Sequence, residues 1–191
     1  MVQVVRATIP KPLERLMVFV DGGYLRSLSK AFFGHDRIHF GRLVPTFIQM
    51  FNTLSDNPFN ANLIRIYYYD AIVEEGHSEY RNQREYFDRI MAMTQHITVR
   101  LGRLVESPKE GFRQKGVDIL MSVDALTKTN HYETGMFLLG DRDFIPLIEA
   151  VKNAGKKTII VYYSPIPSEL KNAFDWRISF DKKALEAWLK E

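Results

Sequence analysis

Short apolar runs alternate with amphipathic segments along most of the chain, and this alternation constrains the fold more than any other feature of the sequence. Apolar runs predict buried strands, and apolar residues spaced three and four apart predict helices between them. Strands are expected at residues 16–20, 63–69, 97–101, 135–139 and 157–163, with an edge strand at 176–180. Helices are expected at 24–32, 43–54, 79–93, 117–127 and 144–153, with a short helix up to 174 and a last one through 185–189. Strands that alternate with helices predict an α/β fold, a three-layer α/β/α sandwich with a mostly parallel central sheet.

The size of the chain indicates one domain. Its 191 residues, 46% of them hydrophobic, suffice for one well-buried core and are few for two. Residues 1–12 are expected to form an N-terminal arm, because Pro10 and Pro12 close an extended stretch. Residues 165–191 are expected to form a C-terminal extension of the same domain.

Composition narrows the function classes. The chain has no cysteine, which excludes disulfides and thiolate metal centres and fits a cytoplasmic protein. No window reaches ~18 consecutive apolar residues, so no membrane association is expected. The net charge of +3 permits a polyanionic partner without requiring one.

Carboxylates follow two of the expected strands directly. Asp21 ends the first apolar run, and Asp141 and Asp143 follow the run at 135–139, while Asp118 stands at the start of a helix. Ligands of an open α/β sheet bind outside the carboxyl ends of its strands. Carboxylates gathered there would repel one another unless a hard cation neutralised them. This pattern therefore predicts a metal site.

Each aspartate also has a structural interpretation. Asp143 could cap the helix that begins at Phe144, Asp21 could serve as a turn residue before two glycines, and Asp118 could stabilise a first helical turn. Asp124 projects to the other side of its helix, which favours a structural hydrogen bond over a metal contact.

Basic residues lie close together between Gly102 and Gly116, and this segment is expected to be a functional or mobile loop. Arg103, Arg113 and Lys115 from this loop, together with Arg142, are expected to rim the acidic pocket and to bind phosphates.

Four motifs in this order resemble those of the NYN domain family. They are Val20-Asp21-Gly22-Gly23, Tyr68-Tyr69-Asp70-Ala71, Gln114-Lys115-Gly116-Val117-Asp118 and Gly140-Asp141-Arg142-Asp143-Phe144. The resemblance extends from about Leu16 to Tyr163, and the chain resembles the bacterial LabA-like branch of the family. It implies a PIN-like, Rossmann-like α/β/α nuclease fold with an acidic site that binds Mg²⁺ or Mn²⁺.

Carried over residue by residue, the resemblance makes Asp21, Asp118, Asp141 and Asp143 both the metal ligands and the catalytic carboxylates. Asp70, Ser122 and Asp124 are expected around them, and Tyr24 is expected to bind substrate. Two positions differ from the family pattern, since Leu139 replaces a common hydroxyl residue and Tyr24 a common asparagine.

The function implied is a metal-dependent ribonuclease, an enzyme that cleaves RNA, with single-stranded RNA as the expected partner. A metal-bound water can attack a phosphodiester without any histidine, and the five histidines here show no ligand spacing. Two alternatives stay open, a non-catalytic RNA-binding or scaffold protein that kept the fold and, less favoured, a metal-dependent phosphatase. The sequence allows a homodimer.

Overall fold

The computed structural model describes residues 11–35, 38–107 and 111–189, so the expected arm at residues 1–12 lies almost wholly outside the described residues. The strands are β1 (Leu13–Asp21), β2 (Asn60–Val73), β3 (Ile97–Ser107), β4 (Gly111–Lys115), β5 (Thr134–Leu138), β6 (Lys157–Tyr163) and β7 (Trp176–Phe180). The α-helices are α1 (Gly22–Phe33), α2 (Phe40–Asn52), α3 (Tyr80–Met93), α4 (Val117–Thr127), α5 (Ile145–Asn153), α6 (Ser168–Ala173) and α7 (Lys182–Leu189). Two short 3₁₀ helices, η1 (Thr129–His131) and η2 (Arg142–Phe144), complete the described elements.

The described strands form a single mostly parallel sheet in the order β4-β3-β2-β1-β5-β6-β7. All neighbouring strands are parallel except β3 and β4, which form an antiparallel hairpin. β1 and β5 are direct neighbours at the centre, with Val18 opposite Met136 and Val20 opposite Leu138. The predicted adjacency of the two strands that precede Asp21 and Asp141 is therefore confirmed.

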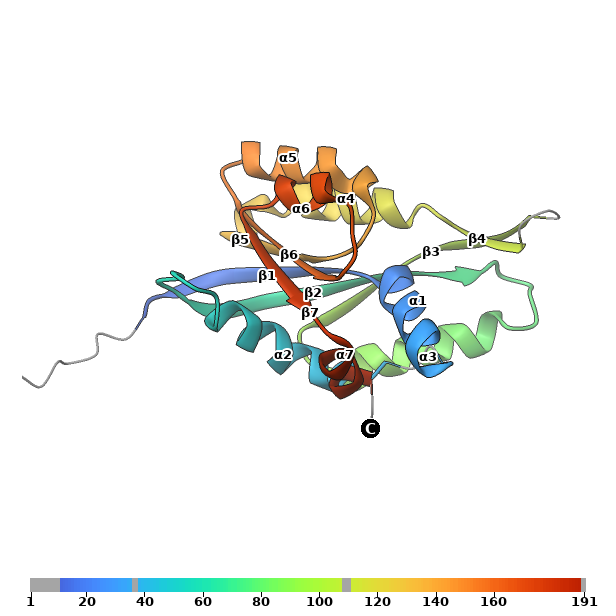
Figure 1. The fold of residues 1–191 in the computed structure, drawn as a ribbon. Helices are drawn as coiled ribbons and strands as arrows, with labels where there is room; N and C mark the ends of the chain where they lie inside the picture. The colour runs from blue at the N-terminus through green and yellow to red at the C-terminus, as the bar shows by residue number, and fades with distance from the viewer. Residues whose placement is uncertain (1–10, 36–37, 108–110, 190–191) are drawn as a thin grey trace, which may run out of the picture.

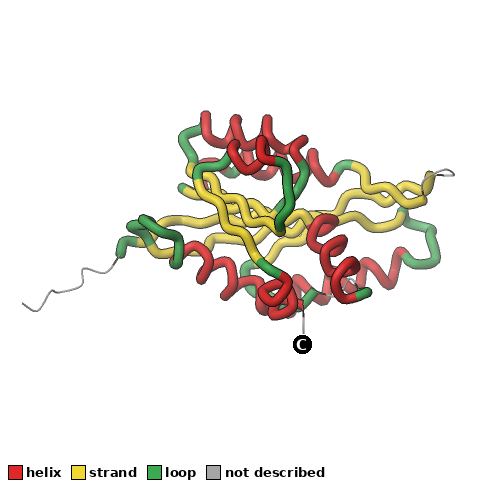
Figure 2. Tube along the Cα trace, viewed as in Figure 1, coloured by secondary structure: helices red, strands yellow, loops and turns green. Residues whose placement is uncertain are grey.

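Helices cover both faces of this sheet, as Figure 1 shows, and the predicted three-layer α/β/α sandwich is confirmed. α1, α2, α3 and α7 lie on one side, and α4, α5 and α6 lie on the other (Figures 1 and 2). Each layer has its own core, because alternate residues of a strand point to opposite faces. Val18 and Tyr68 belong to the first core, whereas Phe19 and Tyr69 belong to the second.

Two expectations about the middle of the chain were wrong. Within the segment expected to be a loop, residues 102–107 instead complete β3 and residues 111–115 form β4. Its polar sequence concealed a strand because every residue of β4 is exposed, so no apolar alternation marks it. Asp70 was expected to end its strand, but β2 continues to Val73 and Asp70 lies fully buried within it.

The last part of the chain belongs to the sheet and its layers. β7 pairs with β6, and Trp188 of α7 stacks near Phe180, with ring centroids 4.7 Å apart. No helix among the described residues is long and apolar enough to cross a membrane.

Candidate active site

The four candidate carboxylates come from three places at the carboxyl edge of the sheet. Asp21 is the last residue of β1, and Asp141 precedes η2 in the turn after the neighbouring β5. Asp118 lies in the first turn of α4, which follows the β3–β4 hairpin. Because the parallel neighbours β1 and β5 end at the same edge, the fold brings Asp21 and Asp141 together there. Asp118 comes to this edge through the hairpin, in which β4 returns antiparallel along β3 before α4 begins.

Asp21 also caps α1, a structural role that differs from the turn role considered for it. Its Oδ1 accepts a hydrogen bond of 3.0 Å from the backbone N–H of Tyr24. The helix start lies tight against β2, since a Cβ on Gly22 would come within 2.5 Å of the Tyr68 ring. Asp21 is therefore held in place by the backbone of α1.

Electrostatic coupling connects the candidate carboxylates. Burial raises the pKa of Asp21 to about 6, and the Asp118 and Asp70 carboxylates add to the rise, although hydrogen bonds from Tyr24 and Gly23 oppose it. Partial desolvation raises the pKa of Asp118, and the Asp141 and Asp143 carboxylates raise it further. Among the described residues, none of the ion pairs includes any of these four aspartates.

Asp141 and Asp143 lie together on an exposed turn. The Asp141 Oδ1 accepts a 2.9 Å hydrogen bond from the backbone N–H of Asp143 and caps η2. Both residues are exposed, so their carboxylates face solvent at the carboxyl edge. The capping role expected for Asp143 thus belongs to Asp141.

The donor chemistry of this edge suits a hard cation, because every candidate ligand is a carboxylate oxygen. In the described parts of the chain, however, no three His, Asp or Glu side chains are arranged to hold a metal ion. The coupled carboxylates are thus near one another without converging on one point.

Asp70 is a buried anchor beside Asp21. It is fully buried, and its Oδ1 receives a 2.5 Å bond from Arg26 Nη2 of α1 and a 3.3 Å bond from Gln114 Nε2 of β4. The Tyr68 hydroxyl donates to its Oδ2 at 3.2 Å. Asp70 therefore ties α1 and the hairpin to the central sheet.

Asp124 is a second buried anchor, which agrees with its structural interpretation. Its carboxylate accepts hydrogen bonds from Arg100 Nε at 2.9 Å, Lys128 Nζ at 2.5 Å and the Tyr69 hydroxyl at 3.2 Å. Ser122 lies half-buried one turn after Asp118 on α4. Asp124 thus holds α4 against β2 and β3.

Tyr24 joins elements on both sides of the site. Its hydroxyl accepts a 3.0 Å hydrogen bond from the Tyr163 N–H and donates at 3.2 Å to the Tyr163 carbonyl. A Cβ on Gly140 would come within 2.4 Å of the Tyr24 ring, so the turn before Asp141 passes directly over it. Leu139, the other position that departs from the family pattern, is fully buried. These contacts make Tyr24 a structural link, whereas substrate binding was expected of it.

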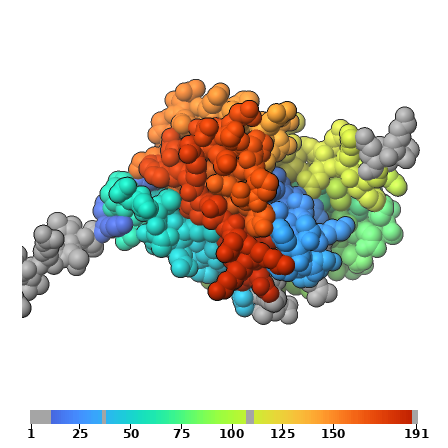
Figure 3. Space-filling view, in the orientation of Figure 1, coloured from blue at the N-terminus to red at the C-terminus, as the bar shows by residue number. Residues whose placement is uncertain are grey.

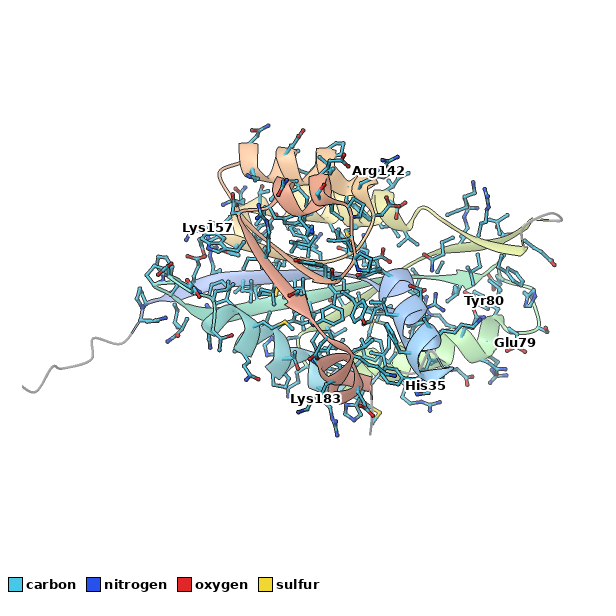
Figure 4. The ribbon with its side chains drawn as sticks, in the orientation of Figure 1. His35, Glu79, Tyr80, Arg142, Lys157 and Lys183 are labelled. Atoms are coloured by element: carbon cyan, nitrogen blue, oxygen red, sulfur yellow. The ribbon has the colours of Figure 1, made fainter. Side chains whose placement is uncertain are left out.

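Three of the four expected phosphate-binding residues gather on the hairpin. Arg103 is paired with Lys115, and Val105 with Arg113, so these side chains share one face. Arg103 also lies 3.6 Å from Glu74, an exposed ion pair. Arg142 stands apart from them, on the α4 and α5 side of the sheet (Figure 4).

Sequence reasoning missed Arg26 and Gln114 as members of the site. A buried carboxylate such as Asp70 needs a partner of opposite charge, and this requirement was the available signal. Nothing in the spacing of the sequence indicates that the partner comes from α1.

Comparisons with known proteins agree with this architecture. The family model for the NYN domain matches residues 15–181. The crystal structure of VPA0982, a protein of unknown function from Vibrio parahaemolyticus RIMD 2210633, has a similar fold with a TM-score of 0.60 at 12% sequence identity. That match covers 88% of this chain and 94% of the other. No curated protein matches the chain.

Proposed function

The chain belongs to the NYN domain family, which is nuclease-like, and we propose that it is a metal-dependent ribonuclease that hydrolyses RNA phosphodiester bonds. The observation that carries this proposal is the electrostatic coupling of four carboxylates that have no ion pair among the described residues: Asp118 raises the pKa of Asp21, and Asp141 and Asp143 raise the pKa of Asp118. Such repulsion lowers the stability of the folded state, so a function that uses the charges explains their presence.

Asp21, Asp118, Asp141 and Asp143 would hold Mg²⁺ or Mn²⁺, both of which prefer oxygen ligands. When bound, such an ion supplies an activated water and neutralises charge that develops on the phosphate. Asp118, Asp141 and Asp143 are exposed, so their side chains are free to change rotamer and converge on such an ion.

Other residues would position the site and the RNA. Asp21 Oδ1 is fixed by the Tyr24 N–H, and the Asp70 network fixes α1 and the hairpin next to it. Arg103, Arg113 and Lys115 would bind the phosphate backbone of single-stranded RNA along the hairpin.

The test is incubation of the purified protein with single-stranded and structured RNAs in Mg²⁺, in Mn²⁺ and in EDTA. Metal-dependent cleavage by the wild type, lost in Asp118→Asn, supports the proposal. Asp88→Asn is the matched control, since Asp88 is half exposed and pairs with Arg84 on α3, away from the site. Cleavage that persists in EDTA, or that Asp118→Asn leaves unchanged, contradicts the proposal.

A second candidate, an RNA-binding protein without catalysis, is favoured by one observation. The described residues hold no ready group of three metal-ligating side chains, whereas Arg103, Arg113 and Lys115 lie on one face of the paired strands β3 and β4. RNA binding without cleavage in either metal would select this candidate. Membership of the LabA-like branch, a cytoplasmic location and a homodimer stay predictions.

A further inference from the structure

A cavity of about 300 Å³ opens beside the acidic edge, between α1, α3 and the ends of β2 and β3. This volume is at the lower end of the range for small-molecule sites. The residues that line it are Arg26, Ala71, Asn82, Gln83, Tyr86, Phe87 and Leu104. None of these was assigned a role by the sequence motifs.

The cavity shares a wall with the candidate active site. Arg26 lines the cavity and also binds Asp70, which Gln114 contacts from the hairpin. Gln114 in turn lies close to Gly23, because a Cβ on that glycine would come within 2.9 Å of the Gln114 Oε1 and 3.2 Å of the Asp21 Oδ1. A chain of direct contacts therefore leads from the cavity to Asp21.

The elements that line the cavity can be located in the views of the whole molecule. α1, the start of α3 and the β3–β4 hairpin lie side by side at one end, where Tyr80 marks the first residue of α3 (Figures 3 and 4). The basic face of the hairpin is at the same end.

The lining combines an aromatic ring, a guanidinium group and two amides. Tyr86 is 41% exposed, so its ring forms an accessible wall. Gln83 uses its Oε1 to accept a 3.1 Å bond from the Val73 N–H, which fixes its amide at the cavity. Asn82 has one long bond of 3.5 Å, to Glu79. Amides are donors and acceptors together, which suits the edge of a base.

The side chain of Arg26, in the wall of the cavity, has a hydrogen-bond donor that no described residue satisfies. Its Nη2 binds Asp70, but its buried Nε has no hydrogen-bond partner among the described residues. A buried donor without an acceptor is unfavourable, and a ligand that placed an acceptor there would remove this cost. Asp70 neutralises the guanidinium charge, which leaves its plane better suited to stacking than to holding a phosphate.

We propose that this cavity binds one unstacked nucleobase of the single-stranded RNA whose backbone lies at the acidic edge, and that it sets a base preference there. Unpaired RNA bases are recognised in this way, by stacking on aromatic and arginine planes and by hydrogen bonds to their edges. The proposal deepens the proposed function and rests on it for the substrate class.

The experiment measures binding in EDTA, where a metal-dependent cleavage cannot occur. Short fluorescein-labelled single-stranded RNAs are titrated by fluorescence anisotropy, including a series in which one nucleotide at a time is abasic. With the wild type, one abasic position is expected to weaken binding by about tenfold, within the range known for base stacking.

Tyr86→Leu removes the stacking ring, and Tyr86→Phe is the matched control that keeps it. Tyr86→Leu is expected to weaken binding of the intact RNA by about tenfold, and the sensitive abasic position should then lose its effect. Tyr86→Phe should bind like the wild type, and Asn82→Leu should reduce the difference between bases. Thermal melting of each variant verifies that it is folded.

Equal effects of Tyr86→Leu on intact and abasic RNA would overturn the proposal, as would an unchanged affinity or no RNA binding by the wild type. Nucleoside monophosphates serve as competitors, and one that bound as tightly as the oligomer would assign the cavity to a free nucleotide instead. Failure of catalysis alone is distinguishable, because the wild type would then bind RNA with the same base dependence but would not cleave it in Mn²⁺.

Discussion

The aspartates of this protein fall into two groups that differ in their partners. Asp70 and Asp124 are buried, and each is held by cationic side chains and a tyrosine hydroxyl. The group at the carboxyl edge, Asp21, Asp118, Asp141 and Asp143, has no ion pair within the described parts of the chain. The neutralised carboxylates of Asp70 and Asp124 stabilise the fold, whereas the mutually repelling carboxylates at the carboxyl edge of the sheet indicate a binding site.

The largest effect is expected from the buried group. Asp70→Ala leaves the Arg26 guanidinium without its carboxylate and the Tyr68 hydroxyl without its acceptor. Loss of one partner of a buried pair should lower the free energy of unfolding by about 3–5 kcal/mol. Urea denaturation measures this change, with Asp88→Ala as an exposed control expected to alter stability by less than ~1 kcal/mol. A loss for Asp70→Ala as small as that of the control would remove the distinction between the groups.

At the carboxyl edge of the sheet, removal of a carboxylate is expected to raise the free energy of unfolding instead of lowering it. The folded pKa of Asp21 is raised from 3.8 to about 6, so its ionised form destabilises the folded protein. Asp21→Asn keeps an acceptor for the Tyr24 N–H and should raise the free energy of unfolding in EDTA at pH 7.5 by up to ~3 kcal/mol.

The pH dependence of this gain has a defined direction. Below pH 3.8 Asp21 is protonated in the folded and unfolded states, so the variant should match the wild type there. The gain should grow between pH 4 and pH 6 and then stay constant as pH rises further. Melting curves across this range measure it, and a variant less stable than the wild type at pH 7.5 would place Asp21 in the structural group.

A smaller loss of stability is expected from a substitution at Tyr24, whose hydroxyl links α1 to Tyr163 at the end of β6. Tyr24→Phe leaves the Tyr163 N–H without its acceptor and should cost about 1–2 kcal/mol of stability. RNA affinity should stay at the wild-type value, because the hydroxyl is engaged with the backbone. Anisotropy and urea denaturation on the same variant test both expectations, and weakened RNA binding at unchanged stability would restore Tyr24 as a substrate-binding residue.

The smallest effect on stability is expected at Lys115, which is exposed on β4. Lys115→Gln should change the free energy of unfolding by less than ~0.5 kcal/mol. It should nevertheless reduce the dependence of log K for single-stranded RNA on log salt by about 0.7, the value of one phosphate contact. Lys183→Gln is the control, since Lys183 lies exposed on α7 at the opposite side of the molecule from Arg142 (Figure 4). An equal salt slope for both variants would show that the basic side chains of the hairpin face solvent and do not contact RNA.

The sequence predicted the sandwich and the central pair of strands because apolar runs record burial directly. Residues 16–20 and 135–139 are buried on both faces in the centre of the sheet, so their pattern had one interpretation. The β3–β4 hairpin escaped prediction because β4 is exposed throughout and has no apolar side to mark it.

The aspartates at the strand ends could be predicted from the sequence, whereas the residues that surround them could not. Aspartate at the end of an apolar run is a local pattern, so Asp21 and Asp141 could be found from the sequence. Asp70 was misplaced because a buried charge normally ends a strand, and its cation comes from Arg26, 44 residues away. Long-range pairing of this kind leaves no trace in local spacing.

The central claim, that the edge carboxylates form a metal site, is tested most directly by the effect of Mn²⁺ on the melting temperature. Binding to the folded state alone stabilises it by ~2.7 kcal/mol when the metal is at about one hundred times its Kd. The wild type and Asp88→Asn should melt at a higher temperature in Mn²⁺ than in EDTA, whereas Asp141→Asn should melt at the same temperature in both. A wild type that Mn²⁺ leaves unchanged, or an Asp141→Asn variant that gains as much as the wild type, would contradict the account.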